Sequence, residues 1–327
     1  MNRKWYKGDT HLHTVNSDGD LTLGQLVEKG KNKGLDFMII TDHNYNTVDE
    51  SYYDGDMLVI QGQEITDEMA HINVWGVKVP EDPPYVLNDA EDYKKLVKKC
   101  KDAGGIISAN HPFCSMCGFQ ISLDNFKFDC VEVWNTVQHS DNMKNRDWWV
   151  DKLLKGEKIA AVGGSDYHRD VAKLPILAMP TTYVHAKSNT EKDILEAIKE
   201  GRCVVTNSPS SSMINLSYGN CGIGDTGSLA DGHKLRVAVT NMMIGHTLKI
   251  YNNDKVIFET KANKNAKLYM TAVDVKEAGF VRAEITYKFP AGIKKIYKLV
   301  EKKFLDCKDN FIPDFIWAFT NPIWIKE

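Results

Sequence analysis

The sequence contains no apolar run near the ~18 residues of a membrane-spanning helix, so a helical membrane protein is excluded. Its first six residues lack the apolar core of a secretion signal, and a histidine motif follows directly, so we expect no cleaved leader. Lys and Arg number 41 against 44 Asp and Glu, and no basic stripe stands out. Bulk electrostatics therefore argue against a nucleic-acid partner without excluding one, because a metal cluster can itself attract phosphate.

Cysteine is too scattered for a disulfide framework. The seven cysteines are odd in number, and no export signal accompanies them, so reduced thiols in a cytoplasmic protein are expected. Cys114 and Cys117 form a single C-x-x-C pair after an Asn-His-Pro turn. Without a second such pair, a loop that lines the mouth of a cavity is favoured over a separate zinc or redox site.

The composition is that of a folded protein with room for two domains. Hydrophobic residues make up 43% and charged residues 26% of the 327 residues, which is typical of a soluble globular chain. Over residues 1–207, short apolar runs alternate with helical patterns, whereas short alternating segments follow the serine-rich turn at 208–212. We predict an α/β domain over 1–207 and a small all-β, sandwich-like domain over 208–327.

The pattern of apolar residues over residues 1–207 predicts strands separated by helices. Thr22 is expected to cap the first helix. Alternating strands and helices favour parallel pairing, in an open sheet or a closed barrel. The expected strands are Gly8–His13, Phe37–Asp42, Met57–Gly62, Ile106–Ala109, Cys130–Trp134, Ile159–Val162 and Thr181–Val184, and the expected helices are Leu23–Lys33, Asp89–Ala103, Asn142–Lys155 and Thr190–Glu200.

The pattern of apolar residues over residues 208–327 predicts β structure. A hairpin turn is expected at residues 252–254, and the aromatic tail is expected to pack on either domain. The expected strands are Met213–Tyr218, Lys234–Asn241, Thr247–Asn252, Lys255–Thr260, Ala266–Thr271 and Phe280–Lys288.

Histidines and carboxylates gather at or just after the expected strands. His11 and His13, like Asp166 and His168, are two residues apart, a spacing that puts both side chains on one face of an extended strand. Such a set exceeds the four ligands of a closed structural zinc site and predicts two or three hydrolytic metal ions. Because many different strand ends contribute, a closed ring of parallel strands is favoured over an open sheet.

The histidines and carboxylates belong to motifs that follow one another along the chain: Asp9-Thr10-His11-Leu12-His13, Ser17-Asp18-Gly19, Thr41-Asp42-His43-Asn44, Glu64, Asn110-His111-Pro112 and Gly164-Ser165-Asp166-Tyr167-His168. In this order they resemble the motifs of the PHP (polymerase and histidinol phosphatase) superfamily of metallohydrolases over residues 5–207. The stretch from Pro180 through Gly201-Arg202 to Pro209 resembles its CehA/McbA-like branch more narrowly. The resemblance implies a distorted TIM-like (β/α)7 barrel with a metal cluster at its C-terminal mouth, followed by a β-rich domain.

The resemblance also implies roles for individual residues. Glu64 would bridge two ions and, with Asp166 and His168, carry the chemistry. His139 is a further candidate for a third ion, or a solvated histidine at a helix start. Arg169 is singled out by position alone: it directly follows His168, where it would meet a substrate anion or lie in a solvated loop. The implied metal ligands are His11, His13, Asp18, His43, Glu64, His71, His111, Asp166 and His168.

The hypothesis that follows is a metal-dependent phosphoesterase that acts on a small phosphorylated molecule through a metal-bridging hydroxide. Imidazole and carboxylate ligands suit Zn, Mn or Fe. A carboxylic or carbamic ester hydrolase of the same fold is the enzymatic alternative, and a noncatalytic metal-bound binding protein is the other. The β domain covers the barrel, shapes the mouth or mediates homo-oligomerisation, and the sequence leaves these open.

Overall fold

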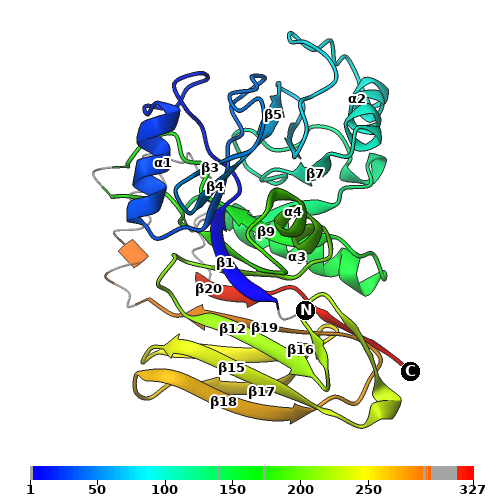
Figure 1. Ribbon diagram of the computed structural model, residues 1–327. Helices are drawn as coiled ribbons and strands as arrows, with labels where there is room; N and C mark the ends of the chain where they lie inside the picture. Colours follow the sequence, from blue (N-terminus) through cyan, green and yellow to red (C-terminus); the bar gives the residue numbers. More distant parts are fainter. Residues whose placement is uncertain (1–2, 138–139, 172–173, 290–291, 293, 296–314) are drawn as a thin grey trace.

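The computed structural model describes residues 3–137, 140–171, 174–289, 292, 294–295 and 315–327. A mixed α/β region lies above a β-rich region, and β20 (Phe315–Thr320) runs between them (Figure 1). None of the helices in these ranges combines the length and the apolar composition needed to cross a bilayer.

The strands of the α/β region form two groups. In the first, β1, β2 and β4 pair in parallel, and β10 pairs antiparallel with β1. In the second, β7, β8 and β9 pair in parallel, whereas β5–β6 and β6–β7 are antiparallel. The bounds are β1 (Lys4–Asp9), β2 (Phe37–Ile39), β3 (Tyr52–Asp54), β4 (Met57–Ile60), β5 (Gly62–Thr66), β6 (His71–Trp75), β7 (Ile106–Ala109), β8 (Cys130–Asn135), β9 (Ala160–Gly164) and β10 (Thr181–Ala186).

The closed (β/α)7 barrel of the sequence analysis is not confirmed by this pairing. Over the described ranges the two groups belong to separate sheets. They meet at the isolated bridges Leu12–Tyr167 and His43–Glu64 and at hydrogen bonds between the Thr182 side chain and the backbone of Gly163. The sequence pattern predicted parallel pairing and did not predict β6, which runs antiparallel to both of its neighbours. A tight turn at Asp67, whose carboxylate accepts from the backbone of Met69 and Ala70, reverses the chain after β5 and makes an antiparallel hairpin.

The helices follow the sequence prediction to within about two residues at each end. Thr22 caps α1 in a capping box with Gln25, as expected. Asp89 and Thr190 are the N-caps of α2 and α4, where their side-chain oxygens accept hydrogen bonds from backbone N–H groups of the first turn. The bounds are α1 (Leu23–Asn32), α2 (Ala90–Asp102), α3 (Ser140–Leu154) and α4 (Glu191–Lys199).

The β-rich region is a sandwich. Leu235, Val237 and Val239 of β15 share one apolar core with Leu248 and Ile250 of β16, which lies in the facing sheet. Asn253 has a φ of 58° in the turn of the β16–β17 hairpin, where a turn was predicted. The bounds are β12 (Met213–Tyr218), β13 (Cys221–Gly222), β14 (Thr226–Ser228), β15 (Lys234–Met242), β16 (His246–Asn252), β17 (Lys255–Lys261), β18 (Ala266–Asp274), β19 (Gly279–Tyr287) and β21 (Ile323–Lys326).

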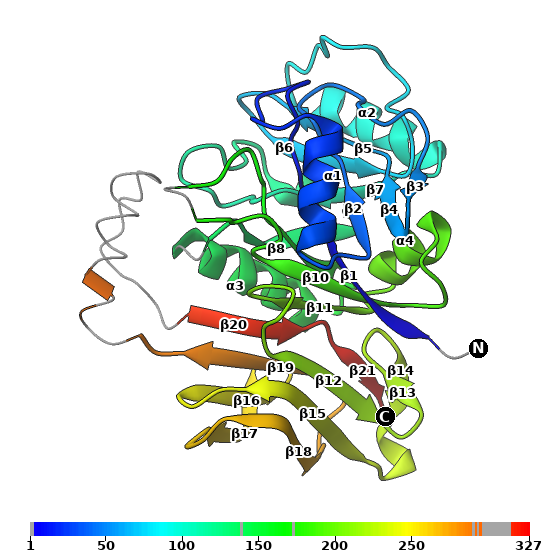
Figure 2. The same cartoon turned by 60° about the vertical axis from the view of Figure 1, so that its left-hand side comes forward.

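The last strands tie the two regions together. β11 (Cys203–Thr206) pairs with β10 on one side and with β20 on the other, so one sheet continues from the α/β region into the sandwich (Figure 2). Phe319 of β20 also packs on Trp149 of α3, with ring centroids 5.9 Å apart. The expected boundary at 207/208 falls directly after β11 and stays a prediction.

Candidate metal centre

Most of the candidate ligands lie in segments that follow strands of the α/β region, whereas Glu64 lies within β5 and His71 begins β6. β1 ends at Asp9, so His11 and His13 lie in the segment after it, where His13 N donates to Tyr167 O at 3.0 Å. His111 and Asp166 have φ values of 29° and 50°, which residues other than glycine seldom adopt. Strain at two such positions is typical of functional sites.

His11, His13 and Asp166 form one group of ligand atoms that lie within 4.8 Å of one another. Asp166 Oδ1 lies 3.1 Å from His13 Nε2 and 3.4 Å from His11 Nε2. Both histidines are buried. The i, i+2 pair therefore meets the carboxylate that the sequence analysis placed with it.

A second group joins His13 to Asp18, His43 and His168. Asp18 Oδ1 lies 3.1 Å from His168 Nε2 and 3.6 Å from His43 Nε2. His168 Nδ1 is 2.9 Å from the carbonyl oxygen of Asp166, which directs Nε2 toward Asp18. This group lies nearer the surface, because the Asp18 side chain is 56% exposed.

Glu64 lies between the histidines of the centre. One of its oxygens, Oε2, is 2.7 Å from His43 Nδ1 and 3.7 Å from His13 Nε2. The other, Oε1, is 3.3 Å from His71 Nδ1 and 3.6 Å from His111 Nε2. A carboxylate whose two oxygens face different imidazoles has the position that a bridge between two ions requires.

Unpaired buried atoms test whether cations fit this arrangement. His11 Nε2, His13 Nε2, His71 Nδ1 and Glu64 Oε2 are buried, and although acids and imidazoles lie close to them, none of the described residues is aligned with them as a hydrogen-bond partner. Buried polar atoms are nearly always paired, so each unpaired atom requires an explanation. Divalent ions of the kind that imidazole and carboxylate bind would satisfy these atoms, and the residues fit such ions.

Burial and charge act in opposite directions on these groups. Burial lowers the pKa of His11, but Asp166, Glu64 and Glu132 outweigh it and raise that pKa well above its ordinary value. Burial lowers the pKa of His13 to about 4. Although burial raises the pKa of Glu64, the surrounding histidines hold it well below its ordinary value. The histidines therefore favour the ionised form of Glu64, which is the form that binds a cation.

Two buried carboxylates, Glu132 and Asp42, support the residues of the centre. The sequence alone had suggested no role for either one. Glu132 Oε1 lies 3.1 Å from His11 Nδ1, and Oε2 accepts from the backbone of His111 at 3.2 Å. Asp42 accepts from Thr14 and Ser17 instead of facing the other ligands. The available signal for Glu132 was an acid within an otherwise apolar strand, which has to find a partner.

The weaker candidates have different outcomes. His139 lies outside the described residues. Arg169 donates to the backbone carbonyl of Asp18 at 3.0 Å and is 3.6 Å from Asp20 Oδ1, so it holds the loop that carries Asp18. Cys117 Sγ is 3.6 Å from His111 Nδ1, so the C-x-x-C loop does border the centre.

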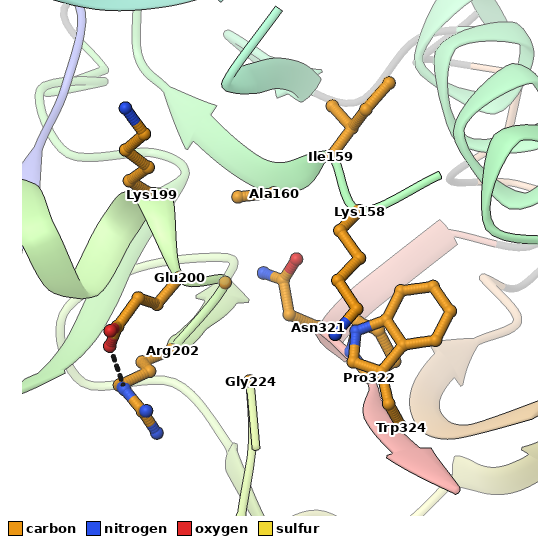
Figure 3. A pocket seen from close by; sticks show the side chains of 11 residues that line it. Lys158, Ile159, Ala160, Lys199, Glu200, Arg202, Gly224, Asn321, Pro322 and Trp324 are labelled. Atoms are coloured by element: carbon orange, nitrogen blue, oxygen red, sulfur yellow. Dashed lines mark hydrogen bonds and ion pairs between the residues drawn. The ribbon is translucent and has the colours of Figure 1, made fainter. Parts of the chain in front are cut away.

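A separate cavity of about 210 Å³ lies at the junction of the two regions (Figure 3). Ala160, Arg202 and Trp324 are among its lining residues. Ala160 begins β9, whereas Asp166 follows the end of that strand, so the cavity and the centre lie at opposite ends of β9. Arg202 is neutralised there by Glu200 and Asp225, as expected of a structural tether rather than a phosphate ligand.

No family model and no curated protein sequence matches this chain. Among solved structures, it is similar to a two-domain protein from Bacteroides vulgatus ATCC 8482 that contains a predicted PHP-like metal-dependent phosphoesterase. The identity is 20%, the match covers 87% of this chain and 91% of the other, and the TM-score is 0.53.

Two further structures match with a TM-score of 0.35 each. A putative metal-dependent phosphoesterase from Bifidobacterium adolescentis ATCC 15703 is 16% identical, over 50% of this chain and 87% of the other. An amidohydrolase from Chromobacterium violaceum is 14% identical, over 49% of this chain and 87% of the other. The chain therefore shares the two-domain fold of the Bacteroides vulgatus protein.

Proposed function

We propose that this chain is a metal-dependent hydrolase of the PHP superfamily, CehA/McbA-like branch, and a phosphoesterase that acts on a small phosphorylated molecule. The observation that carries the proposal is the convergence of imidazoles and carboxylates from distant segments, with buried nitrogens left unpaired. The shared fold supports it, because the similar two-domain protein contains a predicted metal-dependent phosphoesterase.

Two or three divalent ions, Zn, Mn or Fe, would occupy the centre. Asp166 with His11 and His13 would hold one ion, and Asp18 with His43 and His168 another. Glu64 is grouped with His11 and His111 and also with His43 and His71, as a carboxylate that bridges two ions would be. Such ions activate water as a nucleophile near neutral pH and neutralise charge on phosphoryl oxygens.

The chain's own residues set the positions of these ligands. Glu132 accepts at His11 Nδ1, so that Nε2 points to Glu64 and Asp166. His168 is anchored at the carbonyl of Asp166, so it fits a ligand better than a free proton donor. The exposed Asp18 leaves the second group open to solvent, as a substrate site requires.

The test uses purified protein stripped of metal by a chelator and then loaded with Mn, Zn or Fe. Chromogenic phosphate monoesters, phosphate diesters and aryl esters are supplied in parallel, with metal-free protein and Asp166→Asn as controls. We expect metal-dependent release from a phosphate ester and little from the aryl ester. Preference for the aryl ester would instead indicate a carboxylic or carbamic ester hydrolase, and no turnover with a full metal count would indicate a binding protein.

A further inference from the structure

Cys117 lies against two of the candidate ligand histidines. One ligand atom from each of Cys117, His71 and His111 lies within 4.8 Å of the others. The loop that carries Cys117 connects β7 to β8 and is closed by backbone hydrogen bonds, Cys114 N to His111 O at 2.8 Å and Gly118 N to Cys114 O at 2.9 Å. The chain thus presents a sulfur atom to the centre from a folded loop.

The spacing of the sulfur and nitrogen atoms fits a shared ion. Cys117 Sγ lies 3.6 Å from His111 Nδ1. Ligands at ~2.3 Å for sulfur and ~2.0–2.1 Å for nitrogen, in tetrahedral arrangement, lie about 3.5–3.6 Å apart. Cys117 Sγ also donates to Cys114 Sγ at 3.2 Å, and a weak S–H···N hydrogen bond to His111 would have the observed length of 3.6 Å. The experiment must therefore separate a bound ion from these hydrogen bonds.

The neighbouring carboxylate favours the ion. His111 Nε2 faces Glu64 Oε1 at 3.6 Å, which leaves Nδ1 for the sulfur side of the ring. His71 Nδ1 lies 3.3 Å from the same carboxylate oxygen and has no aligned hydrogen-bond partner among the described residues. One oxygen of Glu64 therefore faces a nitrogen of both histidines, so an ion that they bind would lie beside this carboxylate.

We propose that Cys117, together with His71 and His111, binds a divalent cation beside the two-ion centre. The cation replaces the thiol proton of Cys117, and this proton passes to solvent. A sulfur ligand favours Zn or Fe over Mn at this position. The inference rests on the proposed function only in that it adds a position to the same centre, and Cys117 supplies the ligand that the sequence analysis sought at His139.

Cobalt(II) tests the proposal, because a cobalt–thiolate bond gives a charge-transfer band in the near ultraviolet. Metal-stripped full-length protein is titrated with cobalt alone, and the band and the bound-metal count are recorded. Wild type and Cys114→Ser should both give the band. Cys117→Ser should lose the band and bind one ion fewer, and Cys117→His should restore the count without the band. Thermal unfolding of the metal-free variants checks that each one folds.

Two results would overturn the proposal: no band in wild type at full cobalt loading, or a metal count unchanged in Cys117→Ser. Either would make Cys117 a hydrogen-bond partner of His111. Ester hydrolysis is measured on the same samples. Hydrolysis without the band rejects the cysteine ligand alone, whereas the band without hydrolysis of any ester rejects the proposed function alone.

Discussion

Glu132 Oε1 lies 3.1 Å from His11 Nδ1, and both side chains are almost completely buried. The carboxylate fixes the ring of His11 so that Nε2 faces Glu64 and Asp166, at 3.4 Å from each. Partners of this kind orient metal ligands and raise their basicity.

Replacing Glu132 should therefore weaken metal binding without removing a ligand. We expect Glu132→Gln to lower metal affinity roughly 10–100-fold, because a neutral amide neither fixes nor polarises the imidazole equally. Competition with a chromophoric chelator measures this change. Glu196→Gln is the control and should bind as wild type does, because Glu196 lies in α4 and pairs with Lys187. Equal affinity in both variants would contradict the orienting role.

Asp166→Asn should remove an ion and reduce turnover by at least about 10³-fold while the fold survives. Asparagine is the matched change, because it keeps the shape of aspartate and tolerates the φ of 50° at this position. Elemental analysis, circular dichroism and phosphate-ester hydrolysis are the measurements. Full activity with an unchanged metal count would remove Asp166 from the centre.

Asn321 joins the C-terminal segment to the α/β region. Its side chain accepts from Ala161 N at 2.8 Å and donates to the carbonyl oxygens of Ala161 and Cys203 at 2.7 and 3.1 Å. We expect Asn321→Ala to lower the free energy of unfolding by roughly 2–4 kcal/mol, because buried backbone groups lose their partners. Urea unfolding measures the loss. The exposed Asn215→Ala should change stability by less than about 0.5 kcal/mol, and similar values for both variants would refute the tether.

His246 should make the sandwich sensitive to acid. Burial lowers its pKa from 6.5 to about 4, and its Nδ1 accepts from Met243 N at 3.3 Å. Because the folded state takes up the proton less readily than the unfolded state, this stability is complete above pH 6.5 and is lost as the pH falls toward 4. The loss should be roughly 1–3 kcal/mol.

Thermal unfolding of wild type and His246→Asn between pH 8 and pH 4 measures this effect, since asparagine keeps an acceptor without a titrating ring. The wild type should lose stability relative to the variant as the pH falls through this window. Parallel curves would show that protonation of His246 does not contribute.

The local elements could be predicted because their signals lie in neighbouring residues. Thr22 is followed three residues later by Gln25, which specifies a capped helix start. The alternating apolar residues of β15 and β16 mark strands with one buried face. The antiparallel β6 was missed because its pairing depends on the turn at Asp67, and the edges of the sheets depend on contacts between segments far apart in the chain.

The candidate centre divides in the same way. The sequence by itself was enough to predict the candidate ligands, because imidazoles and carboxylates recur beside apolar strands whatever the fold. Only the tertiary structure showed that Glu132 contacts His11, that Asp42 accepts a hydrogen bond from Ser17, and that Cys117 contacts His111. The physical reason is that a side chain's role follows from its distance to residues many positions away, which chain folding sets and local sequence does not.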